Sequence, residues 1–242
     1  KGSPMQLVLS AVFHLDAPTG NIPLDDAVAL ARHPAVKKAI PLALGDSYQG
    51  FRIVGASKDY PVHYGARLAE GRLWNEPMEA VLGAEVAAKS RLGVGANFSG
   101  AHGLAAGGDA HEEEPFKVVG VLAPGGTVLD RLVLTSVESV WEVHAHGGQP
   151  SARKEITALL IQYASPIAAA MLPRQVNASA TLQAASPAYE SARLFRMIGV
   201  GVDVMRAFGL VLVLAAGLSA FIALLNALEE RRYDLAVMRM LG

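Results

Sequence analysis

The segment Ala207–Leu228 (AFGLVLVLAAGLSAFIALLNAL) decides the architecture of this 242-residue chain. It carries no charged residue, and Ser219 and Asn226 are its only polar side chains. As a helix it would span roughly 33 Å, which matches a hydrocarbon core of about 30 Å. A buried core helix is the alternative, but such helices rarely run this far without a charged face. We therefore expect a helix that crosses a membrane.

Small residues recur at every fourth position of this segment, at Ala215, Ser219, Ala223 and Ala227. The spacing places them on one helix face, where a second membrane helix could approach closely. Chance in an alanine-rich segment is the alternative, since a strict GxxxG motif is absent. The stripe is therefore a candidate packing surface. Arginines flank the apolar segment on both sides, so charge alone does not orient the helix.

The composition excludes several classes of protein. Lys and Arg number 21 against 22 Asp and Glu, so the chain lacks the basic excess of a nucleic-acid binder. Hydrophobic residues make up 52% of the chain, which excludes intrinsic disorder. The absence of cysteine excludes disulfide scaffolds, thiolate metal sites and cysteine nucleophiles.

The residues before the apolar segment predict a mixed α+β domain of about 190 residues. We leave the first four residues, Lys1–Pro4, out of the fold prediction. A turn is expected at Gly45-Asp46 and a polar linker over His144–Lys154. Alternation and β-forming residues predict strands over Met5–Leu15, Val36–Leu44, Phe51–Ala56, Glu79–Leu82, Phe116–Leu122, Leu132–Thr135 and Ile156–Tyr163. Helices are expected over Leu24–Arg32, Glu85–Leu92 and Pro166–Leu172, and from Ala188 into the membrane segment.

No motif for bond-making chemistry is present. Lys89-Ser90 lacks the preceding glycine of a phosphate-binding loop, and Phe98 stands where a dinucleotide fingerprint needs its third glycine. Neither a GxSxG nor an HExxH motif occurs. We therefore expect no enzyme activity in this chain.

One group of side chains suits a divalent metal ion. Imidazole and carboxylate oxygens are good zinc ligands, and an His-x-His pair can present two nitrogens to one ion. The alternative is two solvated surface loops, which is what charged, glycine-rich stretches usually form. The candidate residues are Asp109, His111, Glu112, Glu113, Glu114, His144 and His146. If they bind zinc, we expect weak affinity, because binding would have to order both loops.

The residues after the apolar segment resemble a known family. Leu228–Gly242 (LEERRYDLAVMRMLG) is similar to the ERRxxxAxxRxLG signature that follows the second membrane helix of MacB/FtsX-type ABC transporter permeases. Val81–Phe98 (VLGAEVAAKSRLGVGANF) resembles the LGxxVGDxF pattern of their periplasmic domain, although Ala96-Asn97 departs from the usual aspartate. Phe116–Leu122 resembles the strand that follows. The resemblance covers about residues 5–242.

This resemblance implies a topology. Such permeases have four membrane helices per subunit, a periplasmic domain between the first two, and a cytoplasmic ATPase partner that binds ATP. It implies an α+β, two-lobed periplasmic domain, one lobe inserted in the other, followed by a long helix that continues into a transmembrane helix. The implied parts are a membrane-proximal lobe (5–65 and 150–190), an inserted lobe (66–149), a stalk and transmembrane helix (191–228) and a cytoplasmic coupling segment (229–242).

The resemblance also implies a function and partners. We expect a permease subunit in the bacterial inner membrane, mostly periplasmic, that carries ATP-driven movement outward. Expected partners are the ATPase, a second permease copy, membrane lipid and a periplasmic protein, with no cofactor in this chain. The residues expected to contact the ATPase are Glu230, Arg231, Arg232, Asp234 and Arg239.

The substrate and the broader class of protein stay open. The histidine and acidic loops point to zinc acquisition, but lipoprotein, peptide, toxin or drug handling fit the sequence equally well. The alternative function is a single-span, membrane-anchored ligand-binding or sensor protein. A membrane-tethered hydrolase is disfavoured, because no nucleophile and base can be paired.

Overall fold

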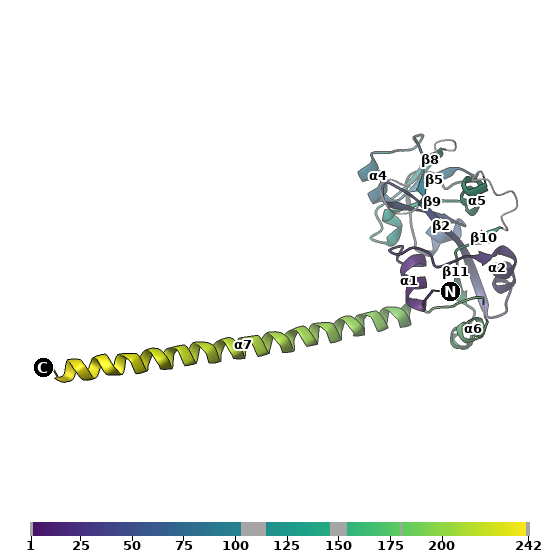
Figure 1. Cartoon of the computed structure of the whole chain (residues 1–242). Helices are drawn as coiled ribbons and strands as arrows, with labels where there is room; N and C mark the ends of the chain where they lie inside the picture. Colours follow the sequence, from purple (N-terminus) through teal and green to yellow (C-terminus); the bar gives the residue numbers. More distant parts are fainter. Residues whose placement is uncertain (1, 103–114, 146–153, 180, 241–242) are drawn as a thin grey trace. The chain divides into compact units, whose positions relative to one another are not determined.

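The computed structural model describes residues 2–102, 115–145, 154–179 and 181–240. The chain divides into two compact units, Lys1–Pro187 and Ala188–Gly242. We call the first unit the sheet domain. The second unit consists of the long helix α7, which begins at Pro187 and ends at Met240 (Figure 1).

Short helices and strands mix throughout the sheet domain, which confirms the predicted α+β class. The helices are α1 (Pro4–Ala11), α2 (Leu24–Ala31), α3 (Asp59–His63), α4 (Ala84–Ser90), the 3-10 helix η1 (Val128–Arg131), α5 (Val137–Ala145) and α6 (Pro166–Ala178). The strands are β1 (Ile22–Pro23), β2 (Val36–Tyr48), β3 (Phe51–Ala56), β4 (Leu68–Gly71), β5 (Glu79–Leu82), β6 (Asn97–Phe98), β7 (Ala101–His102), β8 (Phe116–Leu122), β9 (Leu132–Thr135), β10 (Glu155–Ile156) and β11 (Ala158–Tyr163).

Nine of these strands form one mixed sheet. Its main order is β11-β2-β3-β9-β5-β8-β4, with β6 pairing beside β8 and β7 beside β2. The pairs β3–β9 and β5–β8 are parallel, and the remaining pairs are antiparallel. The long strand β2 runs from the part of the domain that holds α1, α2 and α6 to the part that holds α4 and α5 (Figure 1). β1 and β10 form a separate two-stranded ladder.

The central strands are apolar on both faces, because helices cover each side of the sheet. Successive side chains of a strand point to opposite faces, so one strand supplies two clusters. One cluster contains Val54, Val81 and Leu134 from the sheet, Ala11 from α1 and Tyr60 from α3. The other contains Ile53, Leu82 and Val133 from the sheet, Val86 from α4 and Val143 from α5. This explains why β5 is buried at every position.

The N-terminal segment is a helix, so the strand predicted over Met5–Leu15 is wrong. Ser3 caps α1: its hydroxyl accepts from the Gln6 N–H at 3.2 Å, and the Gln6 side chain accepts from the Ser3 N–H at 2.8 Å. Pro4 occupies the first helical position, where its fixed φ is favourable. This reciprocal capping outweighs the β propensity of the apolar residues that follow.

The first hairpin turns later than predicted. The turn lies at Gln49-Gly50, whose φ angles are +50° and +82°, and not at Gly45-Asp46. Two residues with positive φ give a turn whose twist matches the flanking strands, and glycine adopts that conformation without strain. Asp46 is instead a buried residue within β2, where the pairing register shifts between Leu44 and Ser47.

The polar linker predicted over His144–Lys154 begins two residues too early, because His144 and Ala145 complete α5. Strands belonging to both predicted lobes form the same sheet: β3 of 5–65 pairs with β9 of 66–149. The division of the sheet domain into two lobes stays a prediction.

Candidate functional site

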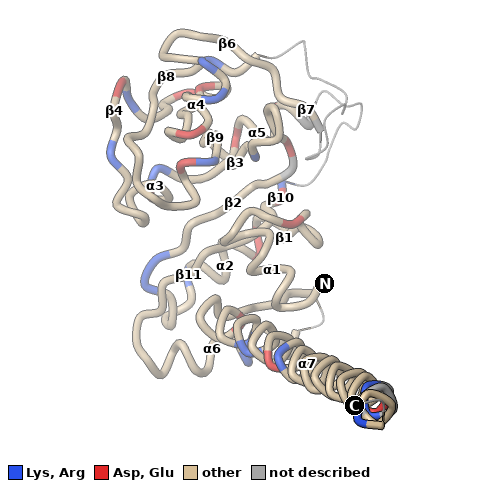
Figure 2. Tube along the Cα trace, turned by 90° about the vertical axis from the view of Figure 1, so that its left-hand side faces the viewer, with Lys and Arg blue, Asp and Glu red and all other residues tan. Residues whose placement is uncertain are grey.

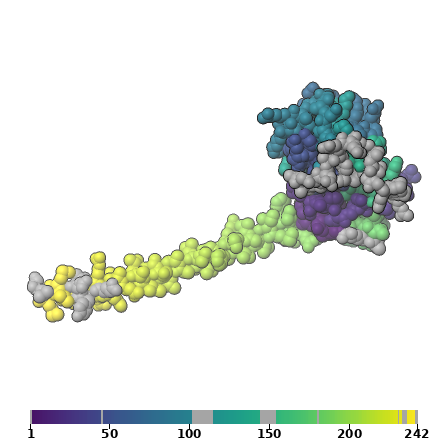
Figure 3. Space-filling model, turned by 45° about the horizontal axis from the view of Figure 1, so that its top comes forward, coloured from purple at the N-terminus to yellow at the C-terminus, as the bar shows by residue number. Residues whose placement is uncertain are grey.

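Helix α7 has the length and composition to cross a membrane. The span that meets this description is Pro187–Glu229, with a mean hydropathy of 2.6 in its most apolar window and none of that window buried within the protein. The predicted span Ala207–Leu228 lies inside it. Leu212, Leu214 and Leu218 are each more than half exposed along the helix, which Figure 3 draws in space-filling form in green to yellow. Exposed leucines in such number need an apolar solvent.

The predicted packing and partner-contact residues lie on α7. Ala215, Ser219, Ala223 and Ala227 are exposed along the helix, and their role stays a prediction. Arg231, Arg232 and Arg239 are exposed near its C-terminal end. Glu230 and Asp234 belong to the same helix, but their side chains lie outside the described residues.

The predicted metal ligands fall almost entirely outside the described part of the chain. Asp109, His111, Glu112, Glu113, Glu114 and His146 lie outside the described residues. His144 lies in α5, with only its backbone described. Among the residues that are described, no group of three or more His, Asp or Glu side chains could hold a metal ion. Zinc binding therefore stays a prediction.

An apolar cavity of about 420 Å³ lies beside β11, at one edge of the sheet. All six residues of β11 line it, together with residues of α1, β2, α3 and α6 and of the segment 182–187. Because successive side chains of a strand point to opposite faces, a cavity lined by all six lies along the strand's edge. Its volume is in the range of small-ligand sites, about 300–1,000 Å³.

The cavity is apolar at one end of β11 and polar at the other. Ala158 pairs with Leu42, and both are buried. Gln162 pairs with Lys38, whose ammonium lies 2.8 Å from the Asp59 carboxylate. The sequence did not predict this site, because the cavity wall includes α1, which was expected to be a strand. The available signal was the uncharged run ALLIQY that forms β11.

A buried polar pair lies next to the cavity wall. The His14 imidazole Nε2 is 2.7 Å from the Tyr60 hydroxyl, and the Tyr60 ring packs edge-on against Tyr64, which lines the cavity. Burial, with a smaller effect from the Arg52 guanidinium, lowers the pKa of His14 to about 4. The imidazole is therefore neutral near pH 7 and serves as a hydrogen-bonding group of the core.

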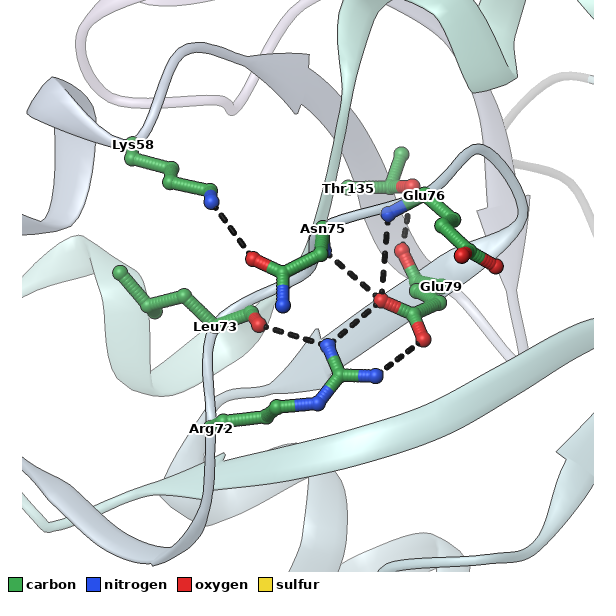
Figure 4. A network of polar contacts seen from close by, with 7 residues as sticks. All are labelled: Lys58, Arg72, Leu73, Asn75, Glu76, Glu79 and Thr135. Carbon is green, nitrogen blue, oxygen red and sulfur yellow. Dashed lines mark hydrogen bonds and ion pairs between the residues drawn. The ribbon is translucent and has the colours of Figure 1, made fainter.

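A second polar cluster holds the turn that precedes β5 (Figure 4). The Arg72 guanidinium donates to both carboxylate oxygens of Glu79, with 2.7 Å between Nη1 and Oε2. The backbone N–H groups of Asn75 and Glu76 donate to the same Oε2. These hydrogen bonds, that from Arg72 above all, outweigh the effect of burial and lower the pKa of Glu79 to about 2. The carboxylate is a fixed structural anchor and not a proton donor at neutral pH.

The region that matches a known protein family lies within the sheet domain. The family described as MacB-like periplasmic core domain matches residues 3–179, from α1 through α6. The periplasmic region of MacB from Actinobacillus actinomycetemcomitans is 16% identical over 65% of this chain and 74% of that chain, with a TM-score of 0.44. The extracellular domain of the noncanonic ABC-type transporter YknZ from Gram-positive bacteria is 15% identical over 69% of this chain and 90% of that chain, also with a TM-score of 0.44. No curated protein matches the chain.

Proposed function

Because the chain belongs to the MacB-like periplasmic core domain family, we propose that it carries ATP-driven movement from a cytoplasmic ATPase to the sheet domain. The family forms part of ABC-transporter-type permeases and is not a family of catalytic enzymes. The chain therefore combines an extracytoplasmic domain with one helix suited to a membrane. The coupling to an ATPase is the proposed part.

The observation that carries the proposal is the continuity of α7. One helix runs from Pro187 at the end of the sheet domain, through the apolar span, to Met240. At 1.5 Å per residue its 54 residues extend roughly 80 Å. The hydrogen bonds along a helix axis resist compression, so a push at one end is transmitted to the other. A break in the helix would have absorbed the movement.

The charged end of α7 is the proposed contact with the ATPase. Arg231, Arg232 and Arg239 are exposed, and each guanidinium can donate two hydrogen bonds to one carboxylate of a partner. Glu230 and Asp234 share this stretch of sequence and complete the proposed contact. ATP would be bound by the partner and not by this chain.

The apolar part of α7 is proposed to meet lipid and a second permease copy. The stripe of Ala215, Ser219, Ala223 and Ala227 would let two helices approach closely, while the larger side chains face lipid. In this arrangement the sheet domain lies outside the bacterial inner membrane, where a periplasmic protein can reach it.

Zinc acquisition is the proposed role for the histidine and acidic residues of 109–114 and 144–146. Isothermal titration with zinc is expected to show weak binding that decreases below the histidine pKa of about 6.5, because protonated imidazole cannot ligate. The heat should disappear in a His111→Ala/His144→Ala/His146→Ala variant. Equal heats from both proteins would mean that these residues do not bind zinc.

A membrane-anchored ligand-binding or sensor protein is the second candidate. The apolar cavity beside β11 favours it, because such a cavity can hold a ligand whether or not the protein is coupled to an ATPase. The two functions differ in their dependence on the charged end of α7.

Charge reversal in the assembled transporter tests the proposal. Arg232→Glu and Arg239→Glu should each reduce stimulated ATPase activity and weaken complex assembly. Arg196→Glu is the matched control, because it makes the same change at an exposed position of α7 before the predicted membrane segment. Normal activity and assembly in both test variants would overturn the proposal and favour the sensor.

A further inference from the structure

The two end strands of the main sheet differ in how their free edges are protected. At one end, β4 has four exposed residues (LAEG). Glu70 is charged, and Gly71 has a positive φ of +75°. The pairing of β4 with β8 is also irregular between Leu68 and Glu70. Short length, charge and irregularity are the features by which edge strands avoid pairing with other chains.

At the other end, β11 is longer and carries no charge, and its pairing with β2 is regular from Ala158 to Gln162 and shifts only before Tyr163. Its six residues, ALLIQY, include no charge, proline or glycine. Leu159, Leu160 and Ile161 are only half-buried, although they are flanked by α1 and α6 around the cavity. Figure 2 shows neither a basic nor an acidic residue on the traces of α1 and β11. An uncharged, apolar edge of this kind is suited to accept another strand.

The free edge of β11 also offers unused hydrogen bonds. β11 pairs in the sheet with β2 on one side. Every second residue of such a strand directs its N–H and C=O away from its one neighbour. In the described part of the chain, no group donates to or accepts from these outward groups of β11. The cavity therefore combines mostly apolar side chains with one line of polar backbone groups.

We propose that this cavity binds an extended, uncharged peptide segment of a partner protein, which adds to β11 as a further strand. A peptide strand satisfies the backbone groups of β11 while its alternate side chains enter the apolar cavity. The proposal rests on the sheet domain alone and does not depend on coupling to an ATPase.

Charge and shape select this occupant over others. Among the described residues that line the cavity, Lys38 is the one lysine or arginine, and Asp59 neutralises it, so a charged segment would gain little. An aliphatic lipid chain would fill the apolar space but leave the backbone groups unpaired. The sheet edge of a second copy would meet α6 and segment 182–187, which also line the cavity, whereas one extended chain needs only about 4.8 Å beside β11.

Hydrogen exchange on the full chain in lipid nanodiscs tests the proposal. The probe is the peptide acetyl-(Val-Thr)3-amide, which is uncharged and long enough to match β11 at about 3.3 Å per residue. Saturating peptide should slow amide exchange in residues 158–163. A matched peptide, N-methylated on every second amide, keeps the apolar side chains but loses the edge hydrogen bonds. Its dissociation constant should be at least tenfold higher.

Two variants locate the binding. Ala185→Trp places a large side chain in the cavity wall and should weaken peptide binding at least tenfold. Ala170→Trp is the control, because Ala170 is an exposed residue of α6 that does not line the cavity. It should bind the peptide as the unmodified chain does.

Three results would overturn the proposal. Unchanged exchange at 158–163 with saturating peptide would show that β11 accepts no strand. Equal affinity for the N-methylated peptide would show that the edge hydrogen bonds play no part. Protection by laurate but not by the peptide would assign the cavity to an aliphatic chain.

Discussion

Strand β5 and the middle of helix α7 are built from the same apolar residues in opposite surroundings. In β5, Val81 and Leu82 are completely buried, with 0% exposure. In α7, Val213 is 72% and Leu214 is 64% exposed. The first pair is covered by helices on both faces of a sheet, and the second pair is covered by nothing within the helix's own unit.

The difference shows that apolar composition alone does not tell a core from a membrane segment. β5 is four residues long, and its neighbours in the sheet bury it. The apolar run of α7 continues for a length that spans a bilayer and has no polar face. Length and the absence of a polar face distinguish the two, so each region should respond to substitutions and to pH in its own way.

A charge in β5 should have the largest effect. Leu82→Asp places a carboxylate among side chains with no room for water, which we expect to cost more than about 4 kcal/mol. The two tryptophans, Trp74 and Trp141, both lie in the sheet domain, so their fluorescence reports its unfolding separately from α7. The cooperative fluorescence transition should be lost. Leu68→Asp in the exposed strand β4 is the control, and an equal loss there would contradict the buried position of β5.

The same substitution in α7 should affect membrane insertion alone. Leu214→Asp is expected to disfavour insertion by about 3 kcal/mol, the cost of an acidic residue near the centre of a membrane helix. The measurement is the fraction of protein that resists alkaline extraction from membranes, with Leu214→Phe as the apolar control. Tryptophan fluorescence should be unchanged. Destabilisation of the sheet domain by this variant would mean that Leu214 is packed against protein.

Acid should weaken the sheet domain through His14. Its pKa is about 4 when folded and 6.5 when unfolded, so the unfolded chain binds more protons between these values. Stability should therefore be full above pH 6.5 and decrease by about 2–3 kcal/mol as pH falls to 4. His14→Asn should remove this part of the decrease, and asparagine tolerates the positive φ of +54° at this position. Urea titrations at several pH values give the free energy of unfolding at each pH. If this free energy decreases between pH 6.5 and 4 as much in His14→Asn as in the unmodified chain, the assignment to His14 is refuted.

The smallest effect is expected at the Arg72–Glu79 pair, which is partly exposed. Glu79→Gln should lower the Tm of the fluorescence transition by about 2–4 °C at pH 7, because it weakens the hydrogen bonds to the turn. The depressed pKa of Glu79 means that the native chain loses stability as pH falls from about 4.5 towards 2, and the variant should lose less. Glu70→Gln, in exposed β4, is the control and should change neither the Tm at pH 7 nor the loss of stability in acid. An equal change in Tm from Glu70→Gln and Glu79→Gln would show that the Glu79 hydrogen bonds do not stabilise the turn.

Much of this architecture could be predicted from local sequence. The long apolar run predicted α7, and short runs of β-forming residues predicted the central strands Glu79–Leu82, Phe116–Leu122 and Leu132–Thr135, which are confirmed. The family resemblance, carried by residues 81–98 and 228–242, is also confirmed by the match to residues 3–179. These features depend on short-range patterns, so one sequence is sufficient to show them.

Other features depend on contacts that no local pattern shows. α1 was missed because the capping signal, Ser3 with Gln6, was set aside with the first residues. The cavity could not be predicted, since it forms where β11 meets α1 and α6, elements far apart in sequence. The Glu79 anchor depends on hydrogen bonds from Arg72 and from the turn that lies between the two residues. No local pattern in the sequence shows that these groups meet.

The parallel pair β3–β9 has a consequence for how the domain folds. These strands are neighbours in the middle of the sheet, yet residues 57–131 lie between them in the chain. Joining the ends of so long a loop costs entropy, but the cost grows only with the logarithm of its length. Insertions in the surface loops of 57–131 should therefore change stability little. Formation of the sheet also needs the β2–β11 pairing across residues 49–157, so we expect these distant closures, and not the β2–β3 hairpin, to limit the folding rate of the domain.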